Sequence, residues 1–181
     1  MQMPAPLRKL ALTGHVICSV GWLGSVAAFL GLAITGLASR DAQKARSAYI
    51  AMELTGWYVI VPLSFASLIT GLLQSLGTTW GLFRHYWVIA KLMINLLATT
   101  LLLVHMRPIS QMAFMARDAA LSPSDHRQLQ IQLVADAGLA LVAFVVAATL
   151  SVYKPRGITP YGARKQREQR SPSRAQDRSS E

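Results

Sequence analysis

Two histidines, a tryptophan and a lysine stand in otherwise apolar stretches of this chain and could do chemistry there: His15, Trp22, Lys91 and His105. Neutral imidazole binds haem iron or copper, and an ammonium group can pair with an anion such as a porphyrin propionate or a lipid headgroup. Ionisable groups at membrane depth are costly and usually face the interior of a helix bundle. These four are therefore candidate cofactor-binding residues, with His15 and His105 as candidate metal ligands.

The elements that must position these residues are long apolar segments. Hydrophobic residues make up 52% of the 181 residues and charged residues only 14%, whereas soluble proteins carry about 25% charged residues. In lipid only helices and closed barrels satisfy their backbone, and these runs lack the alternation of barrel strands. The sequence therefore predicts an all-α fold, an antiparallel four-helix transmembrane bundle.

The predicted boundaries give one transmembrane domain over residues 10–153, between a tail at residues 1–9 and a basic tail at residues 154–181. Helices are predicted at about residues 10–37, 49–76, 86–106 and 123–153. The first apolar run is too long for the core of a signal peptide, so we expect it to be retained. The C-terminal tail has no apolar periodicity, which predicts disorder.

Several local features are expected at the ends and interruptions of these helices. Residues 39–47 and 107–121 are predicted as connections, the second with an interfacial amphipathic helix at 111–120. Pro62 should kink the second helix because proline removes a backbone hydrogen bond. The segment Ser122-Pro123-Ser124-Asp125 has the residue types of a helix N-terminus.

Basic residues are divided unequally between the two sides of the predicted bundle. The side that holds both tails carries eleven Lys and Arg residues, and the opposite side carries six. Because cytoplasmic flanks collect Lys and Arg, we predict a multi-pass protein of the plasma (inner) membrane with both termini in the cytoplasm. The net charge of +10 then reflects membrane topology, so no nucleic acid is expected as a partner. The basic C-terminal tail should lie along anionic lipid headgroups.

The polar groups within the predicted helices fall at two depths, each drawing on three helices as a site inside a bundle requires. The cytoplasmic set is His15, Gln74 and Lys91 with His85 at its boundary, and the outer set is Glu53, His105 and Asp136. Within the first set, Lys91 either extends to the cytoplasmic surface or faces inward toward an anionic group. Trp22 is either a packing residue or the wall of a cofactor pocket.

The outer set has two interpretations. In one, Glu53 and Asp136 form ion pairs with Arg107 near the headgroups. In the other, thioether sulfur joins His105 in a copper site, because thioethers prefer Cu(I). The nearby thioethers are Met106, Met112 and Met115.

The familiar signatures of hydrolases and nucleotide enzymes are missing from the sequence, which favours a protein that is not an enzyme. There is no Ser/His/Asp elbow, phosphate loop, HExxH or CxxC motif. The single cysteine, Cys18, excludes an internal disulfide. Small residues on the first and fourth helices allow close packing, either within the bundle or between copies in a homo-oligomer.

Five segments carry a resemblance to known proteins. They are His15 with Gly21-Trp22-Leu23-Gly24, Arg40-Asp41-Ala42-Gln43, Met52 to Pro62, Gly77 to Lys91, and Leu103 to Met106. Over about residues 10–153 the chain resembles a bacterial family of predicted four-helix integral membrane proteins with a domain of unknown function. Through His15, Trp22, Trp87-x3-Lys91 and His105 it is more distantly similar to the copper-resistance D-type membrane domain and the HemJ-type protoporphyrinogen oxidase.

The resemblance implies a bundle that holds haem or copper, and three hypotheses follow. The first is a non-enzymatic membrane protein that binds haem b through His15 or His105. The second is a copper-handling membrane protein. The third is a porphyrin oxidoreductase in which His15 and Lys91 are essential.

Overall fold

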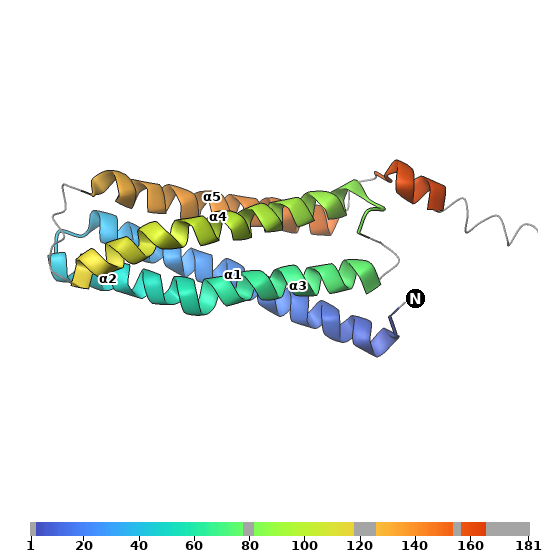
Figure 1. The fold of residues 1–181 in the computed structure, drawn as a ribbon, viewed down its shortest axis with the longest axis horizontal. Helices are drawn as coiled ribbons and strands as arrows, with labels where there is room; N and C mark the ends of the chain where they lie inside the picture. Colours follow the sequence, from blue (N-terminus) through green and yellow to red (C-terminus); the bar gives the residue numbers. More distant parts are fainter. Residues whose placement is uncertain (1–2, 78–81, 118–125, 154–156, 166–181) are drawn as a thin grey trace, which may run out of the picture.

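The computed structural model describes residues 3–77, 82–117, 126–153 and 157–165, and its architecture is helical (Figure 1). The elements are α1 (Ala5–Ala38), α2 (Ala42–Thr55), the π-helical turn η1 (Gly56–Ile60), α3 (Val61–Gly77), α4 (Tyr86–Arg117) and α5 (Arg127–Tyr153). Because α2, η1 and α3 run on as one rod, the chain forms four long helical rods. The predicted all-α four-helix bundle is confirmed.

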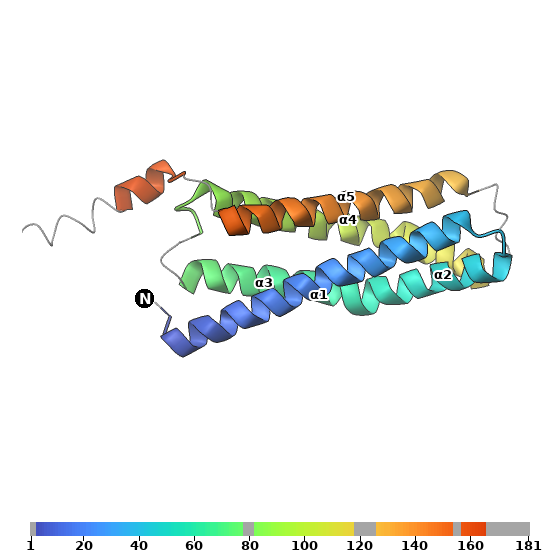
Figure 2. The ribbon, with the colours of Figure 1, turned by 180° about the vertical axis from the view of Figure 1, so that it is seen from behind.

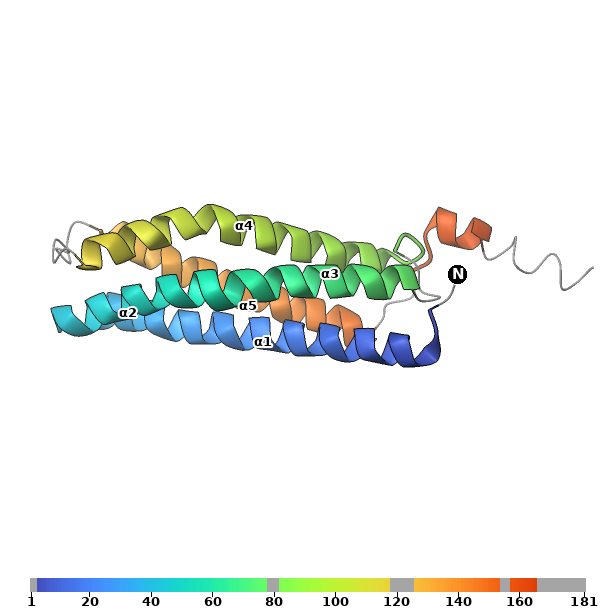
Figure 3. The ribbon, with the colours of Figure 1, turned by 60° about the horizontal axis from the view of Figure 1, so that its bottom comes forward.

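Successive rods run in opposite directions and lie side by side along the long axis of the molecule (Figures 1 and 3). α1 packs against the α2–η1–α3 rod and against α5, and α4 packs against the same two rods. α1 and α4 therefore lie on one diagonal of the bundle. The N-terminus and residues 157–165 lie at one end, which we call the terminal end, and the turn between α1 and α2 lies at the other, the far end (Figure 2).

The outer surface of the bundle is apolar. All four rods are long and apolar enough to cross a membrane, and no more than 22% of the most apolar window of any rod is buried inside the molecule. An apolar surface this large is incompatible with a water-soluble monomer, whereas the hydrocarbon core of a bilayer, about 30 Å thick, would cover it. These features indicate a multi-pass membrane protein.

The buried core occupies the half of the bundle nearer the far end. Its members include Trp22, Phe29, Tyr49, Met52, Met106, Met112 and Leu133. In the described part of the terminal half, the buried side chains within the bundle are the hydroxyl residues Ser64, Ser67 and Thr99, and no hydrophobic side chain there is fully buried. The two halves therefore differ, one closely packed and the other more open and more polar.

α2 begins earlier than the sequence suggested. Residues 39–47 were predicted as a loop, but the carboxylate of Asp41 caps the helix by accepting hydrogen bonds from the backbone N–H of Gln43 at 2.9 Å and of Lys44 at 3.4 Å. A capping aspartate satisfies backbone donors that would otherwise lack partners. The helix therefore starts at Ala42, and Asp41 was the signal that could have located it.

α4 continues eleven residues beyond its predicted end at residue 106. The connection expected at 107–121 is helical as far as Arg117, and Pro108 lies inside the helix. An internal proline costs roughly 3 kcal/mol or more, but Ile109, Met112 and Ala116 beyond it are buried in the core. Burial of this second apolar stretch outweighs the lost hydrogen bond. Residues 118–121 lie outside the described part of the chain, as does the predicted helix start at Ser122–Asp125.

The irregularity expected at Pro62 takes the form of the π turn just before it. The N–H of Val61 donates to the carbonyl of Gly56, five residues back. This turn inserts an extra residue, which rotates the face of α3 relative to α2. Gly56 fits because Met106 packs against it: a Cβ there would lie 2.8 Å from the Met106 methyl carbon.

The described part of the C-terminal tail is folded, which differs from the predicted disorder. Ile158 forms an isolated antiparallel bridge with His85, and residues 160–165 form a short helix. Thr159 is buried. The sequence missed this segment because its contacts are with a distant turn rather than with its own neighbours.

The close approach of α1 and α2 at the far end makes a testable prediction. A Cβ at Gly36 would lie 2.5 Å from the buried ring of Tyr49, whereas a Cβ at Gly31, on the same helix, would meet nothing within 4 Å. Alanine favours a helix over glycine by about 0.5–1 kcal/mol, so Gly31→Ala should be neutral or stabilising. Gly36→Ala should instead destabilise by about 1–3 kcal/mol through overpacking. Unfolding of both variants in mixed micelles compares them; equal stability of the two would contradict the packing described for Tyr49.

Candidate functional site

His15 is fixed by groups of α3 in the terminal half of the bundle. Its Nδ1 lies 3.2 Å from the carbonyl oxygen of Ser67 and 3.2 Å from Oγ1 of Thr70. The Thr70 hydroxyl already donates to the carbonyl of Ala66, so the Nδ1–H of His15 has two acceptors. Among the described residues no hydrogen bond engages Nε2. His15 is therefore oriented through one ring nitrogen while the other is left for a ligand.

Small and polar side chains surround this imidazole. The hydroxyls of Ser19 and Ser67 lie 2.9 Å apart and bridge α1 and α3 one turn further into the bundle. Gly71 leaves room for the ring, since a Cβ there would lie 3.0 Å from Cε1 of His15. The site is thus lined by groups that tolerate a polar ligand.

Lys91 faces a neighbouring helix at the same end. Its Nζ donates a hydrogen bond to Oγ of Ser151 on α5 and lies 6.0 Å from the centroid of the Trp87 ring. The inward orientation of Lys91 is therefore the one found, and Lys91 stands at the same end of the bundle as His15, on the diagonally opposite rod.

The other two members of the predicted cytoplasmic set lie differently. The ring of His85 stands at the start of α4, 6.3 Å from the Trp87 ring, and its backbone pairs with Ile158. Gln74 is half-buried on α3. His85 therefore belongs to the surface of the terminal end and not to the group of side chains around His15.

Trp22 belongs to the core. Its side chain is 3% exposed and packs edge-on against Phe144 of α5, with ring centroids 4.6 Å apart. Such a pair stabilises the α1–α5 contact by roughly 0.5–1.5 kcal/mol beyond its burial. Of its two predicted roles, the structure favours packing.

His105 faces α5 and uses both ring nitrogens. Nδ1 lies 2.7 Å from the carbonyl oxygen of Leu101, and Nε2 lies 3.0 Å from Oδ2 of Asp136 and 3.4 Å from the amide nitrogen of Gln132. Oδ2 of Asp136 is buried and has no hydrogen-bond partner, so its contact with His105 is one of distance, which pairs opposite charges only when the imidazole is protonated. A metal at His105 would have to displace one of these partners.

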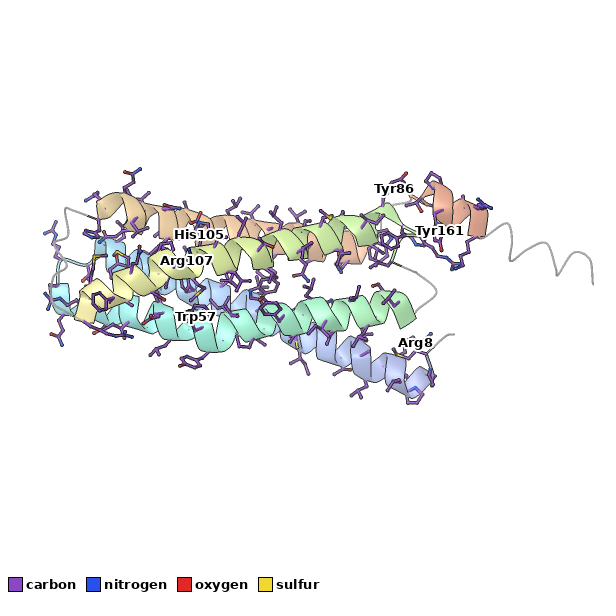
Figure 4. The ribbon with its side chains drawn as sticks, in the orientation of Figure 1. Arg8, Trp57, Tyr86, His105, Arg107 and Tyr161 are labelled. Atoms are coloured by element: carbon purple, nitrogen blue, oxygen red, sulfur yellow. The ribbon has the colours of Figure 1, made fainter. Side chains whose placement is uncertain are left out.

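Glu53 pairs with Arg117 rather than with Arg107. The Arg117 guanidinium lies 2.5 Å from Oε2 of Glu53, while Arg107 is exposed. The ion-pair interpretation of the outer set is therefore correct in kind but named the wrong cation. Arg117 was missed because α4 was predicted to end before it. One turn from Glu53, the indole N–H of Trp57 donates to Ser110 at 3.2 Å (Figure 4 labels Trp57).

The two candidate metal ligands do not share a site. His15 lies at the level of Lys91, and the fourteen residues from Lys91 to His105 span about 21 Å of helix. The predicted thioethers do not gather at His105 either, since Met106 packs against Gly56 and Met112 is buried in the core. Among the described residues no group of three or more His, Cys, Asp or Glu side chains could hold a metal ion.

A shallow hollow of about 440 Å³ lies on the outer surface of α4 near the far end. Its lining residues are Ser110, Gln111, Phe114 and Met115. It is far along α4 from Lys91 and contains neither candidate histidine. It therefore does not extend the His15 cluster.

The sequence matches no protein-family model and no curated protein, and the fold matches no solved structure. The outer level is closed by the Glu53–Arg117 and His105–Asp136 contacts. At the inner level, Nε2 of His15 has no hydrogen-bond partner among the described residues, and Lys91 brings an ammonium group to the same end. The His15–Lys91 cluster is thus the better candidate site.

The corrected ion pair can be tested with a double-mutant cycle. Glu53 is 16% exposed and Arg117 is 50% exposed, so we expect a coupling of about 0.5–1 kcal/mol between Glu53→Gln and Arg117→Gln. Glu53→Gln with Arg107→Gln should be additive. Unfolding in mixed micelles measures both cycles. A larger coupling to Arg107 than to Arg117 would refute the pairing described here.

Proposed function

We propose that the chain is a plasma-membrane protein that would hold b-type haem in the terminal half of its bundle, with Nε2 of His15 as a ligand to the iron. The observation that carries this proposal is the hydrogen bonding of His15. Ligating histidines generally donate their other ring N–H to a carbonyl or carboxylate, which fixes the ring and the tautomer. The Nδ1 contact with the Ser67 carbonyl is an arrangement of this kind.

Lys91 supplies a charge of the right sign for this ligand. A haem carries propionates, and an ammonium group in a partly buried position can pair with one of them. Lys91 reaches the His15 level from the diagonal helix, while its neighbour Ser151 offers a further hydroxyl. This gives the proposed site one axial ligand and one counter-ion from different rods.

The packing of the terminal half also suits a large planar group. No hydrophobic side chain in the described part of that half is fully buried, and a Cβ at Gly14, next to His15, would meet nothing within 4 Å. Bound haem would supply one-electron redox chemistry, and its apolar ring would fill space between the rods. The residues of the chain would bind and orient it.

A second function, a porphyrin oxidoreductase, is favoured by the same pairing of His15 and Lys91. The imidazole could exchange a proton with a bound porphyrin while the ammonium group holds a propionate. This candidate differs from the first because the porphyrin would be a substrate rather than a resident cofactor. Copper receives less support, since Met106 packs against Gly56 and Met112 is buried in the core.

The proposed orientation places the terminal end in the cytoplasm. Met3 and segment 157–165 both lie at this end, where the Met3 N–H donates to the Gly77 carbonyl at 3.3 Å (Figure 1). In the sequence, the two tails and the 77–85 connection together hold eleven of the 18 Lys and Arg residues, which is the bias found on cytoplasmic flanks.

The visible spectrum of the purified full-length protein tests the haem proposal. After expression with haem precursor and copper supplied, we expect a Soret band that is lost in His15→Ala and retained in His105→Ala. Lys91→Gln should weaken haem retention about two- to five-fold, because the substitution removes a partly exposed ion pair between the lysine and a haem propionate.

Other outcomes of this experiment are equally decisive. Copper without a Soret band would favour a metal-handling protein, and the absence of both would reject either cofactor. Protoporphyrinogen oxidation that requires both His15 and Lys91, without retained haem, would favour the oxidoreductase. Loss of the Soret band only in His105→Ala would move the ligand to the outer level.

The orientation has its own test. A reporter that works only in the cytoplasm, fused to the C-terminus, should be active, and one that works only outside should be silent. The opposite result would invert the bundle without affecting its fold. A reporter placed between α1 and α2 serves as the matched control and should give the reverse pattern.

A further inference from the structure

The C-terminal segment 157–165 is docked onto the turn that precedes α4. The N–H of Thr159 donates to the carbonyl of Arg84 at 3.0 Å, and its hydroxyl donates to the carbonyl of Phe83 at 2.5 Å. On the other side of the bridge between His85 and Ile158, the N–H of Tyr86 donates to the carbonyl of Gly157 at 3.4 Å. These bonds join residues more than 70 positions apart and hold the segment in a defined place.

Gly162 makes this docking sterically specific. Its N–H donates to Oγ1 of Thr159 at 3.1 Å, and a Cβ at this position would lie 2.5 Å from the carbonyl oxygen of Arg84 and 3.1 Å from its Cα. Backbone atoms cannot give way as the end of a side chain can. A larger residue at 162 would therefore lift the segment from the turn.

The docked surface presents aromatic rings beside cations. Tyr86 and Tyr161 are 57% and 55% exposed and lie at the terminal end of the bundle (Figure 4). Lys165 lies with its Nζ 3.4 Å from the hydroxyl of Tyr161 and 5.7 Å from the centre of that ring. Arg164 is its neighbour on the same short helix. Tyrosine rings favour the headgroup level of a bilayer, where one face is apolar and the other wet.

The charged side chains that the structure describes at this end are all basic. The acidic residues of the described chain are Asp41, Glu53 and Asp136, and all three lie in the other half of the bundle. Arg8, at the start of α1, lies at the terminal end as well (Figure 4). A cationic, aromatic surface at the end of apolar rods is complementary to a phosphate group lying above acyl chains.

We propose that segment 157–165, docked on residues 83–86, forms a binding site for the headgroup of an anionic phospholipid of the surrounding membrane. The docked fold fixes the short helix that bears Arg164 and Lys165 beside the turn that precedes Tyr86, so a headgroup meets preplaced charges. A loose basic tail, by contrast, would attract anionic lipid without needing the docked conformation. This difference separates the two arrangements experimentally.

Native mass spectrometry of the full-length protein in detergent, titrated with phosphatidylglycerol or phosphatidylcholine, measures the site. The wild-type protein should bind phosphatidylglycerol in preference to phosphatidylcholine. Removing two cations in Arg164→Gln/Lys165→Gln should weaken phosphatidylglycerol binding roughly 10- to 30-fold. The control Arg40→Gln/Lys44→Gln, which removes two cations from the far end, should leave binding unchanged.

The second variant keeps every charge and removes only the docking. Gly162→Val should lift the segment, and hydrogen exchange of the amides at 157–165 confirms its release while the rods stay protected. In Gly162→Val, phosphatidylglycerol binding should weaken about as much as it does in Arg164→Gln/Lys165→Gln. Retention of binding in released Gly162→Val would assign the effect to a loose tail and overturn the proposal. So would an absence of lipid preference, an inert Arg164→Gln/Lys165→Gln, or an equal loss in the far-end control.

Discussion

A polar side chain within a lipid-embedded bundle must find a partner inside the protein, and where that partner lies on another helix the contact sets how the rods meet. Water is absent there, so an unpaired donor or charge keeps its full desolvation cost. Each rod accordingly carries such a contact: His15 to Ser67 between α1 and α3, Lys91 to Ser151 and His105 to Asp136 between α4 and α5. Apolar packing alone would allow the rods to slide along each other, because lipid is as apolar as leucine. The polar pairs fix their register.

The same constraint divides the bundle into two unlike halves. Toward the far end, large side chains fill the interior and the Glu53–Arg117 pair closes it. Toward the terminal end, hydroxyls and glycines replace the large side chains, and the polar contacts there leave Nε2 of His15 without a hydrogen-bond partner among the described residues. A closely packed half gives rigidity, and an open polar half gives room for a ligand. The candidate chemistry therefore lies where packing is weakest.

The terminal end combines this open half with the docked C-terminal segment. Thr159 ties that segment to the turn whose next residues begin α4, and Lys91 lies less than two turns further along the same helix. Cofactor binding and headgroup binding, as proposed, would thus act on neighbouring parts of one helix. Because the terminal end would lie at the membrane surface, a lipid headgroup bound there would influence the position of α4.

The sequence by itself determined the number of rods, their membrane character and the residues worth testing. Apolar runs of spanning length separated by charged gaps carry this information locally, since in lipid no other backbone arrangement is available. The capping residue Asp41 shows that the start of α2 could also be predicted from the sequence. The tertiary structure decided which polar groups meet. α4 continues through Pro108 and so brings Arg117 to Glu53. This continuation depends on burial against the other rods, and burial of that kind cannot be seen in a local sequence pattern. The docking of Thr159 likewise depends on a turn 75 residues away. Partners are chosen by the packing of distant segments, and that choice exists only once the chain has folded.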